Sequence, residues 1–438
     1  SMYHRFDTYD RIGRGVFNPN IDGGEACTLT CGLCPHHKSG TLLANIDVTN
    51  RCNLNCEFCF ANARACGFIY EPSFTEIVGM MALLRSEEPV PCPAVQFAGG
   101  EPTMRDDLVK LVQAARKLGF SQVQMASNGI KLARDENLAK ELRIAGLSTV
   151  YLHFDGVSRE TNPLLEKTSL PAIENCRKVG LGVVLVPTII KGRNDHEIGG
   201  IIQFAAKNVD IIRGINFQPI AFTGAAKEED VEAGRVTVSD ITRAVEEQTN
   251  GALTSRDFYP IPSVMTLCDL IEAYTGKPQV MFCAHPHCGA ATYGFVNEKN
   301  DIVPINRVVD VDKFFEEANK MADKLRNAGK TGKYLAAAGG IARLGKSVSS
   351  EEVEGIRINL KRLIYDALVK HDYESLGEFH KNALFIGTMH FMDNYNYDTD
   401  RVERCCIHYA TPDGRLIPFC TYNSGPVWRE NARTPKGV

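Results

Sequence analysis

The sequence lacks a long apolar stretch. The longest one, from Leu181 to Ile190, is about half of what a membrane-spanning helix needs. An excess of charge is also missing, because 49 basic and 53 acidic residues give a formal net charge of −4. The chain therefore lacks the net positive charge that is typical of proteins that bind nucleic acids. With 44% hydrophobic and 23% charged residues, the composition is that of a soluble globular protein, and we recognise no signal peptide in it.

Cysteine, by contrast, is abundant. The chain holds 15 cysteines, and many of them stand in groups separated by two or three residues. Such spacing is typical of metal ligands, whereas disulfides are rare in the reducing cytosol. We therefore predict a cytoplasmic protein that binds metal through its cysteines.

The central cysteine group is the most informative. Leu43 to Val48 reads as a short apolar strand, after which a loop presents Cys52, Cys56 and Cys59, with Phe58 directly before the last. Three thiolates on one tight loop can hold three irons of a cubane iron–sulfur cluster and leave the fourth iron open. A zinc knuckle is the alternative interpretation of these cysteines taken alone.

A second motif decides between these interpretations. Some forty residues later a strand runs into the turn Gly99-Gly100-Glu101-Pro102. Together with the cysteine spacing, the aromatic residue and the preceding strand, this turn resembles the radical SAM superfamily. The resemblance implies that the turn binds the methionyl amino group of S-adenosylmethionine. Glycines let a backbone approach a ligand closely, and Glu101 would supply a charge partner for the ammonium.

Strand and helix patterns alternate through the first half of the chain. We predict six strands, each followed by a helix, so that a parallel sheet with right-handed crossovers forms. Six repeats fit the partial (βα)6 TIM-like barrel of the radical SAM superfamily, with cluster-binding extensions at its N- and C-terminal ends. We predict an N-terminal auxiliary-cluster segment at residues 1–42, the barrel at 43–222, and a region with auxiliary-cluster ligands and the substrate channel at 223–438. The expected strands are 43–48, 95–97, 122–126, 149–154, 183–189 and 211–217.

Polar residues directly after two of these strands are candidates for the cofactor site. Asn128 and Asp155 each follow a strand, and active-site groups of such barrels lie at the C-terminal strand ends. The superfamily resemblance implies contact with the ribose or the carboxylate of S-adenosylmethionine. The chemistry of the Asn-Gly and Asp-Gly turns explains these residues equally well.

Three further cysteine groups suggest two auxiliary clusters. Two such clusters need eight ligands, and a turn at Pro412-Asp413-Gly414 predicts a hairpin that brings Cys405 or Cys406 near Cys420. Adjacent strand residues point to opposite faces, so Cys405 and Cys406 are not expected to share one cluster. His36 and His37, which follow the N-terminal cysteine group, are either a possible cluster ligand and its neighbour or solvated polar residues after the cluster loop. The remaining candidate ligands are Cys27, Cys31, Cys34, Cys268, Cys283 and Cys288.

Longer motifs narrow the resemblance. The stretches 27–39, 43–56, 89–94, 96–103 and 408–415 look like the archaeal tetraether lipid synthase family, some of whose members have been described as pterin methylases. Members of that family carry an additional rubredoxin-like segment with paired cysteines. The residues before Cys27 contain no cysteine, which leaves the exact product open.

This narrower resemblance implies that unactivated methyl ends of isoprenoid lipid chains are joined by a carbon–carbon bond. S-adenosylmethionine on the central cluster would yield a 5′-deoxyadenosyl radical, with electrons from a low-potential ferredoxin or flavodoxin-like donor. A lipid substrate would also imply a deep apolar channel and peripheral membrane contact. The alternatives are a radical methylase of a pterin or another small molecule, a peptide-modifying radical enzyme, and an electron carrier.

Overall fold

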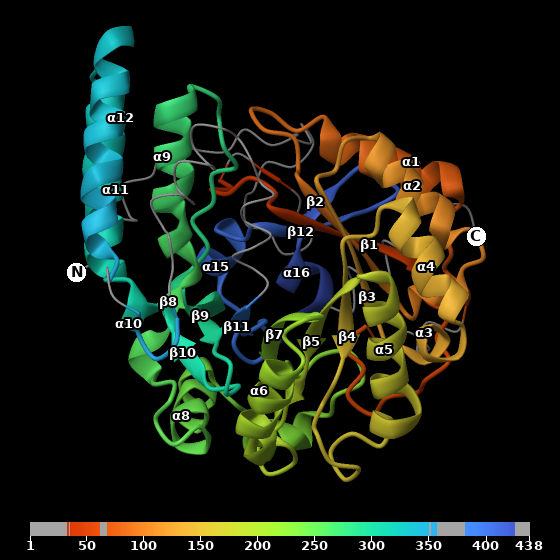
Figure 1. Ribbon diagram of the computed structural model, residues 1–438. Coiled ribbons are helices and arrows are strands. Elements are labelled where there is room, and N and C mark those ends of the chain that lie inside the picture. The colour runs from red at the N-terminus through yellow and green to blue at the C-terminus, as the bar shows by residue number, and fades with distance from the viewer. Residues whose placement is uncertain (1–32, 35, 62–67, 350–351, 357–381, 425–438) are drawn as a thin grey trace.

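The computed structural model describes residues 33–34, 36–61, 68–349, 352–356 and 382–424. Two predicted cluster ligands, Cys27 and Cys31, lie outside these residues, as does most of a helix expected after residue 352. The part that the structure describes is built around one curved sheet of thirteen strands (Figure 1).

The first half of the chain forms the predicted alternation of strands and helices. Helix α1 begins at a reciprocal capping box formed by Ser73 and Glu76. The expected strand 183–189 is interrupted at Pro187, which has no N–H to donate to a ladder. The elements are β1 (Leu43–Thr49), α1 (Phe74–Arg85), β2 (Ala94–Gly99), α2 (Leu108–Lys117), β3 (Gln122–Ser127), α3 (Ile130–Arg134), α4 (Glu136–Ala145), β4 (Thr149–His153), α5 (Leu170–Val179), β5 (Gly182–Val186), β6 (Thr188–Ile189), α6 (Ile198–Lys207) and β7 (Ile212–Pro219).

Strands from the second half of the chain extend this sheet at both edges. The elements are α7 (Val231–Gly234), α8 (Val238–Gln248), β8 (Tyr259–Pro260), α9 (Met265–Thr275), β9 (Gly289–Val296), β10 (Ile302–Pro304), α10 (Ile305–Val308), α11 (Val311–Arg326), α12 (Lys330–Leu344), β11 (Ala383–Met389), α15 (Thr399–Glu403), β12 (Ile407–Ala410), β13 (Leu416–Pro418) and α16 (Phe419–Ser424). The strand order is β10-β9-β11-β7-β5-β4-β3-β2-β1-β12-β13.

The parallel part of the sheet forms an open, TIM-like barrel. Strands β1 to β5 and β7 are parallel neighbours, as predicted, and β12 and β11 pair in parallel with β1 and β7. At the two edges β9 and β13 pair in antiparallel fashion, so the barrel does not close through them. The predicted fold class, a partial TIM-like barrel, is confirmed.

Helices α1 to α6 cover the outer face of the barrel (Figure 1). Alternate strand residues point into this helical layer, and they belong to one large apolar core. Examples are Ile46, Phe97, Met125, Leu152 and Leu185, each at most 1% exposed. The other face of each parallel strand therefore points into the barrel.

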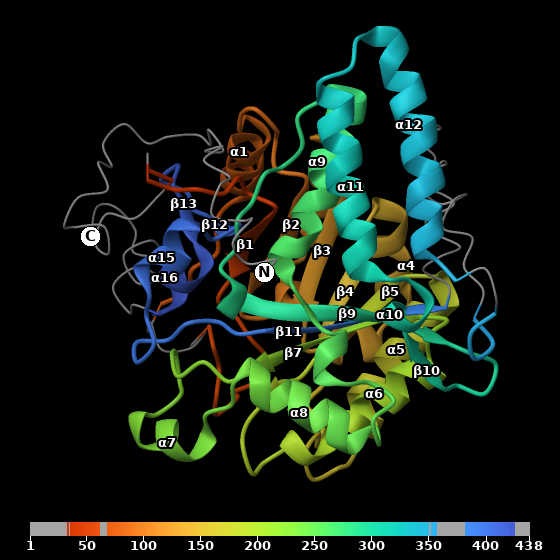
Figure 2. The same ribbon diagram turned by 90° about the vertical axis from the view of Figure 1, so that its left-hand side faces the viewer.

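Helices α9, α11 and α12 stand together on the far side of the molecule from α4 and α5 (Figures 1 and 2). The run of small residues Ala336–Gly340 lies inside α12. Its small residues serve helix packing, since a Cβ added to Gly340 would overlap the sulfur of Met321 on α11.

Candidate active site

The central cysteine loop leaves the C-terminal end of β1, where Asn50 ties it to the returning chain. The Asn50 side chain donates to the backbone oxygen of Phe68 and accepts from the backbone N–H of Tyr70, at 2.8 and 2.9 Å. The sequence assigns Asn50 merely to the turn after the strand. In the structure it fixes the base of the loop that carries the three cysteines.

The three cysteines of the loop are neighbours, as predicted. Burial, followed by the charges of Cys59 and Cys52, raises the pKa of the Cys56 thiol to about 11. Cys56 is nevertheless exposed, and the other two are half-buried. Among the described residues no set of three His, Cys, Asp or Glu side chains is already arranged around one metal position. The donor set itself, three thiols on one partly exposed loop, fits an iron–sulfur cluster.

Phe58 and its neighbour Glu57 contact Arg193, which lies in the loop after β6. The Arg193 guanidinium lies 5.0 Å from the centre of the Phe58 ring, and its Nη1 lies 3.1 Å from a Glu57 carboxylate oxygen. A cation over an aromatic face is an attractive contact. The role of Phe58 beside the cofactor stays a prediction.

The two glycines of the second motif pack against the root of the cysteine loop. Gly100 N–H donates to the backbone oxygen of Thr49 at 2.7 Å, and Glu101 N–H donates to that of Arg51 at 2.8 Å. A Cβ added to Gly99 or Gly100 would overlap the Thr49 or Arg51 oxygen. Glycine is therefore required here for contact with the protein's own backbone.

Glu101 is buried and joins the ends of β2 and β3. Its carboxylate accepts hydrogen bonds from the hydroxyls of Thr103 and Ser127 at 2.6 and 2.9 Å, and from the backbone N–H of Asn128 at 2.8 Å. Burial raises its pKa despite these donors. The predicted pairing of Glu101 with a cofactor ammonium remains untested.

Asn128 reaches the cysteine loop from the end of β3. Its amide nitrogen donates to the side-chain oxygen of Asn53 at 2.7 Å, while its own oxygen accepts from the N–H of Ile130. Asn53 lies between the first two cysteines of the loop. The structure therefore brings Asn128 to the cysteine loop, where the sequence predicts it.

Asp155 lies near the same loop, and His153 pairs with it. The charge of Asp155 contributes to the raised pKa of Cys56. Its carboxylate lies 3.0 Å from His153 Nε2, and this charge raises the pKa of His153. Sequence reasoning missed His153. Its place on the inward face of β4, two residues after Tyr151, is the signal that could have identified it.

The segments that carry the auxiliary cysteines come together at one side of the barrel. Lys38 N–H donates to the Glu403 oxygen, Gly40 N–H to that of Met281, and Leu42 N–H to that of Cys406. The chain before β1 therefore lies between residues 281–283 and 403–406. Cys34, on this chain, is buried.

Within this region Cys288, Cys405 and Cys420 are neighbours. Burial raises the pKa of the Cys420 thiol, and the charges of Cys405 and Cys288 raise it further. The predicted hairpin of β12 and β13 is present, with Gly414 in its turn at φ 81°. Which cysteines hold which cluster remains a prediction.

Cys283 and Cys268 both lie beside the hairpin residues. Cys283 N–H donates to Ser39 Oγ at 2.9 Å, and Ser39 Oγ donates to the Arg404 oxygen. Cys268 lies on α9 and packs against an apolar cluster that contains Cys406 and the two neighbours of Cys283.

His37 is engaged in a buried hydrogen-bonded chain. Its Nε2 lies 2.8 Å from the Cys405 backbone oxygen and 3.0 Å from His408 Nε2. Burial lowers the pKa of His37 to about 4. These contacts give His37 a structural role at the hairpin. His36 is exposed.

An aromatic cluster joins the cysteine loop to the C-terminal elements. The ring of Phe60, next to Cys59, lies 5.5 Å from that of Phe419 in a stacked arrangement, and Phe419 stacks on Phe391 at 4.2 Å. Phe419 directly precedes Cys420. The loop for the central cluster and the hairpin region thus share one packed interface.

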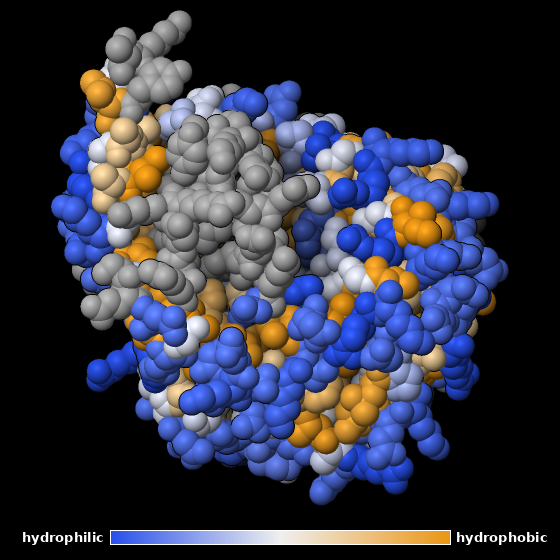
Figure 3. Space-filling view, viewed as in Figure 1, coloured by the Kyte–Doolittle hydropathy of each residue, from blue (hydrophilic) through white to orange (hydrophobic). Residues whose placement is uncertain are grey.

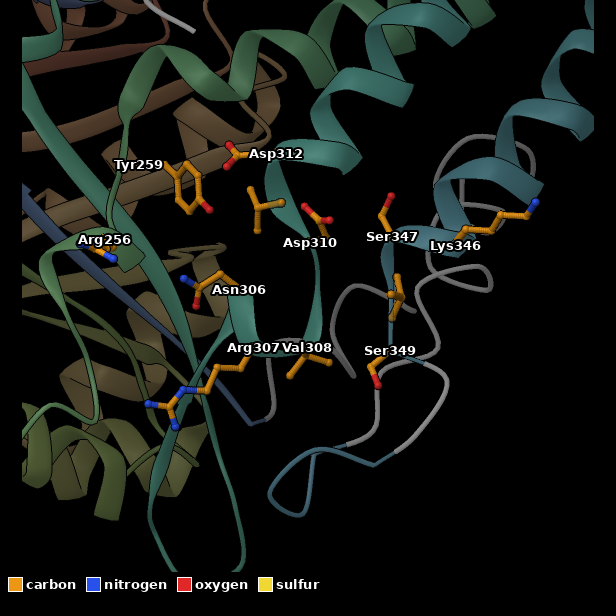
Figure 4. Close-up of a pocket in the computed structure, with 12 residues that line it drawn as sticks. Arg256, Tyr259, Asn306, Arg307, Val308, Asp310, Asp312, Lys346, Ser347 and Ser349 are labelled. Atoms are coloured by element: carbon orange, nitrogen blue, oxygen red, sulfur yellow. The ribbon is translucent and has the colours of Figure 1, made fainter. Parts of the chain in front are cut away.

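A cavity of about 620 Å³, which no cysteine lines, lies between β8, α10 and the start of α11 (Figure 4). Its polar residues have structural partners: Asp310 caps α11, Arg307 pairs with Glu354, and Asn306 donates to Asp257. It contains none of the predicted site residues. We therefore locate the active site at the cysteine loop.

Comparison with known proteins identifies the family. Residues 46–205 match the Radical SAM superfamily. A 7,8-dihydro-6-hydroxymethylpterin dimethyltransferase of Methanocaldococcus jannaschii is 50% identical over 433 residues, which are 97% of this chain and 84% of that protein. The chain belongs to the radical SAM superfamily. Membership implies S-adenosylmethionine, one 4Fe–4S cluster and an electron donor, so the zinc-knuckle and electron-carrier interpretations are abandoned.

Other similarities are more distant. A GTP 3′,8-cyclase of Clostridium acetobutylicum is 25% identical over 295 residues, 64% of this chain and 87% of that protein. Coproporphyrinogen III oxidase from Escherichia coli, a radical SAM enzyme, aligns with 50% of this chain and 54% of its own at 12% identity, with a TM-score of 0.34. The latter similarity is too weak to support any conclusion.

The predicted joining of isoprenoid chains is contradicted. The Methanocaldococcus relative, which matches nearly the whole chain, is named as a pterin dimethyltransferase. The inner face of the barrel agrees with this correction, because Asn45, Gln96 and Gln124 place amides there, and an alkyl chain cannot pair with amides.

None of the described helices is both long and apolar enough to span a bilayer. The face shown in Figure 3 is mostly hydrophilic outside the grey atoms.

Proposed function

We propose that this chain is a radical SAM methyltransferase and that its substrate is a pterin. The observation that carries the proposal is the 50% identity to the Methanocaldococcus pterin dimethyltransferase over 97% of the chain. An identity over 97% of the chain includes the regions outside the barrel, so it is not confined to the motifs that bind the cofactor.

The residues at the strand ends have separable tasks in this proposal. Cys52, Cys56 and Cys59 would hold the cluster, which with S-adenosylmethionine supplies reductive cleavage of a carbon–sulfur bond and hence radical chemistry. Asn128 steadies the loop through Asn53. Glu101, in the turn after β2, would pair with the ammonium group of the cofactor. Asp155, at the end of β4, would lie beside the cofactor.

The auxiliary clusters belong to the same proposal. Cys27, Cys31 and Cys34 would bind one, and Cys283, Cys288 and the hairpin cysteines would complete the ligand sets. The proximity of Cys288, Cys405 and Cys420 supports this arrangement. A ferredoxin or flavodoxin-like protein would provide electrons.

The test is an anaerobic assay with reconstituted protein. We expect that the protein, given S-adenosylmethionine, a reductant and 7,8-dihydro-6-hydroxymethylpterin, forms products heavier by one or two methylene units, detected by mass spectrometry. S-adenosylmethionine labelled at its methyl carbon shows the source of the added carbon. Cys56→Ala should form neither methylated pterin nor 5′-deoxyadenosine. If the wild-type protein makes 5′-deoxyadenosine but never methylates the pterin, the proposal is wrong.

A further inference from the structure

Three amide side chains stand side by side across the barrel. Asn45 on β1 is in register with Gln96 on β2, and Gln96 is in register with Gln124 on β3. The alternating residues of these strands, among them Phe97 and Met125, belong to the core under the outer helices. The three amides therefore point the other way, into the barrel.

The fold does not account for these amides. Asn45 is 2% exposed and Gln124 is 7% exposed, yet Asn45 Oδ1 and Gln124 Oε1 accept no hydrogen bond from the residues that the structure describes. An amide oxygen buried without a donor costs free energy, and central parallel strands are normally lined with aliphatic side chains. Polar groups kept at such a cost indicate a ligand.

The Gln124 amide also lies beside Tyr151. Burial raises the pKa of Tyr151, and the neighbouring Gln124 side chain acts in the opposite direction. The amide oxygen of Gln124, which has no donor among the described residues, is left as an acceptor. Gln96 between the two buried amides is half-buried and so more accessible.

Small residues lie next to the amides, toward the cysteine loop. Ala98 follows Gln96 by two residues and Ala126 follows Gln124 by two, a step of roughly 7 Å along each strand. Both alanines are half-buried at the centre of the sheet. Tyr151 is in register with Ala126 and so flanks this surface. A flat ring that lies on two alanines beside an aromatic side chain fits this surface.

We infer that Asn45, Gln96 and Gln124 recognise the aminopyrimidinone edge of the pterin, an inference that rests on the proposed function. That edge presents a carbonyl acceptor, two adjacent N–H donors and a ring-nitrogen acceptor, and a primary amide offers one donor and one acceptor in the same plane. The acceptor oxygens of Asn45 and Gln124 would take the ring N–H and the 2-amino group. The opposite, hydroxymethyl-bearing edge then faces the cysteine loop.

The experiment replaces Gln96 and Gln124, one at a time, by leucine, an apolar side chain of similar size. We expect Gln96→Leu and Gln124→Leu to bind 7,8-dihydro-6-hydroxymethylpterin about tenfold or more weakly, measured by anaerobic calorimetry on the reconstituted protein. Gln113→Leu is the matched control, because Gln113 is exposed on α2, on the outer side of the barrel. It should bind like wild type.

A second measurement changes the ligand instead of the protein. The analogue with a 2-oxo group in place of the 2-amino group replaces a donor by an acceptor, so wild-type protein should bind it about tenfold or more weakly than the pterin. Equal affinity for the two ligands overturns the inference even where a leucine variant fails to fold. Leucine variants that fold and keep the wild-type affinity also overturn it. A wild-type protein that neither binds nor methylates the pterin instead removes the proposed function.

Discussion

Glu87, just beyond the end of α1, is a buried carboxyl, and only one of its oxygens accepts a hydrogen bond from the residues that the structure describes. The Thr41 hydroxyl donates to it, and Thr41 also lies 2.9 Å from His408 Nδ1. Through His408 and His37 the chain of contacts reaches the backbone of Cys405. Burial raises the pKa of Glu87 from 4.5 to about 8. A neutral carboxyl therefore belongs to the folded state at neutral pH.

We predict that the contribution of Glu87 to the free energy of unfolding falls as the pH rises from about 4.5 through about 8. In this window folded Glu87 holds a proton that the unfolded chain has released, so rising pH removes this contribution. The buried His37, whose pKa is lowered to about 4, acts in the opposite direction below about 6.5. Glu87→Gln mimics the protonated carboxyl, so the free energy of unfolding of wild type, minus that of the variant, should fall across this range in chemical denaturation. The prediction fails if wild type and variant have the same pH dependence.

At the level of elements, the loop after β7 clamps the cysteine loop. Ala225 N–H donates to the Cys59 oxygen at 3.1 Å, and a Cβ added to Gly224 would overlap that oxygen. Thr223 in turn donates to the Asn423 oxygen on α16. The backbone that presents Cys59 is thus held by the barrel and by the C-terminal helix together.

We predict that Gly224→Ala impairs the central cluster because the new methyl group displaces Cys59. The variant should hold several-fold less iron at this site and form correspondingly less 5′-deoxyadenosine, measured by iron analysis and chromatography. Gly251→Ala is the control: Gly251 also has a positive φ, of 75°, but its Cβ would meet nothing within 4 Å. Both variants share the backbone strain, so equal iron contents would show that the overlap at Cys59 has no effect.

Elements with local signals could be predicted from the sequence. The capping box at Ser73, the six barrel strands and the hairpin turn at Gly414 are set by neighbouring residues, and all are present. Strand β11 and the pairing of β12 with β1 escaped prediction because the partner strands, β7 and β1, lie far away in the chain. The helical state of Gly340 depends on its contact with Met321 on another helix.

The candidate site divides in the same way. The cysteine spacing and the glycine turn identified the cofactor chemistry, which is local. The substrate was predicted wrongly because motifs shared by relatives with different substrates report the common chemistry and not the ligand. The amides at Asn45, Gln96 and Gln124 come from three separate strands, and no pattern in the sequence links them before the register is known.

At the scale of the whole molecule, three segments far apart in the chain meet beside the barrel: residues 38–42, residues 281–288 and residues 390–406. Residues 38–42 bond to both Met281 and Cys406, while His390 N–H donates to the Cys288 oxygen at 2.9 Å. β12, which follows these cysteines, pairs directly with β1, which leads into the central cysteine loop. Any cluster held there is attached to the same strand as the catalytic loop.

From this arrangement we predict about twelve irons per reconstituted chain, four for each of three cubane clusters. Cys288→Ala should lose about four of them and still cleave S-adenosylmethionine without substrate, because the central loop keeps its three thiols. Cys56→Ala should lose a similar amount and all cleavage. Cys176→Ala, a buried thiol on α5 within the apolar core, should keep the full iron content. An iron content that Cys288→Ala leaves unchanged would show that the cysteines beside the hairpin are structural thiols, and their convergence would then serve packing alone.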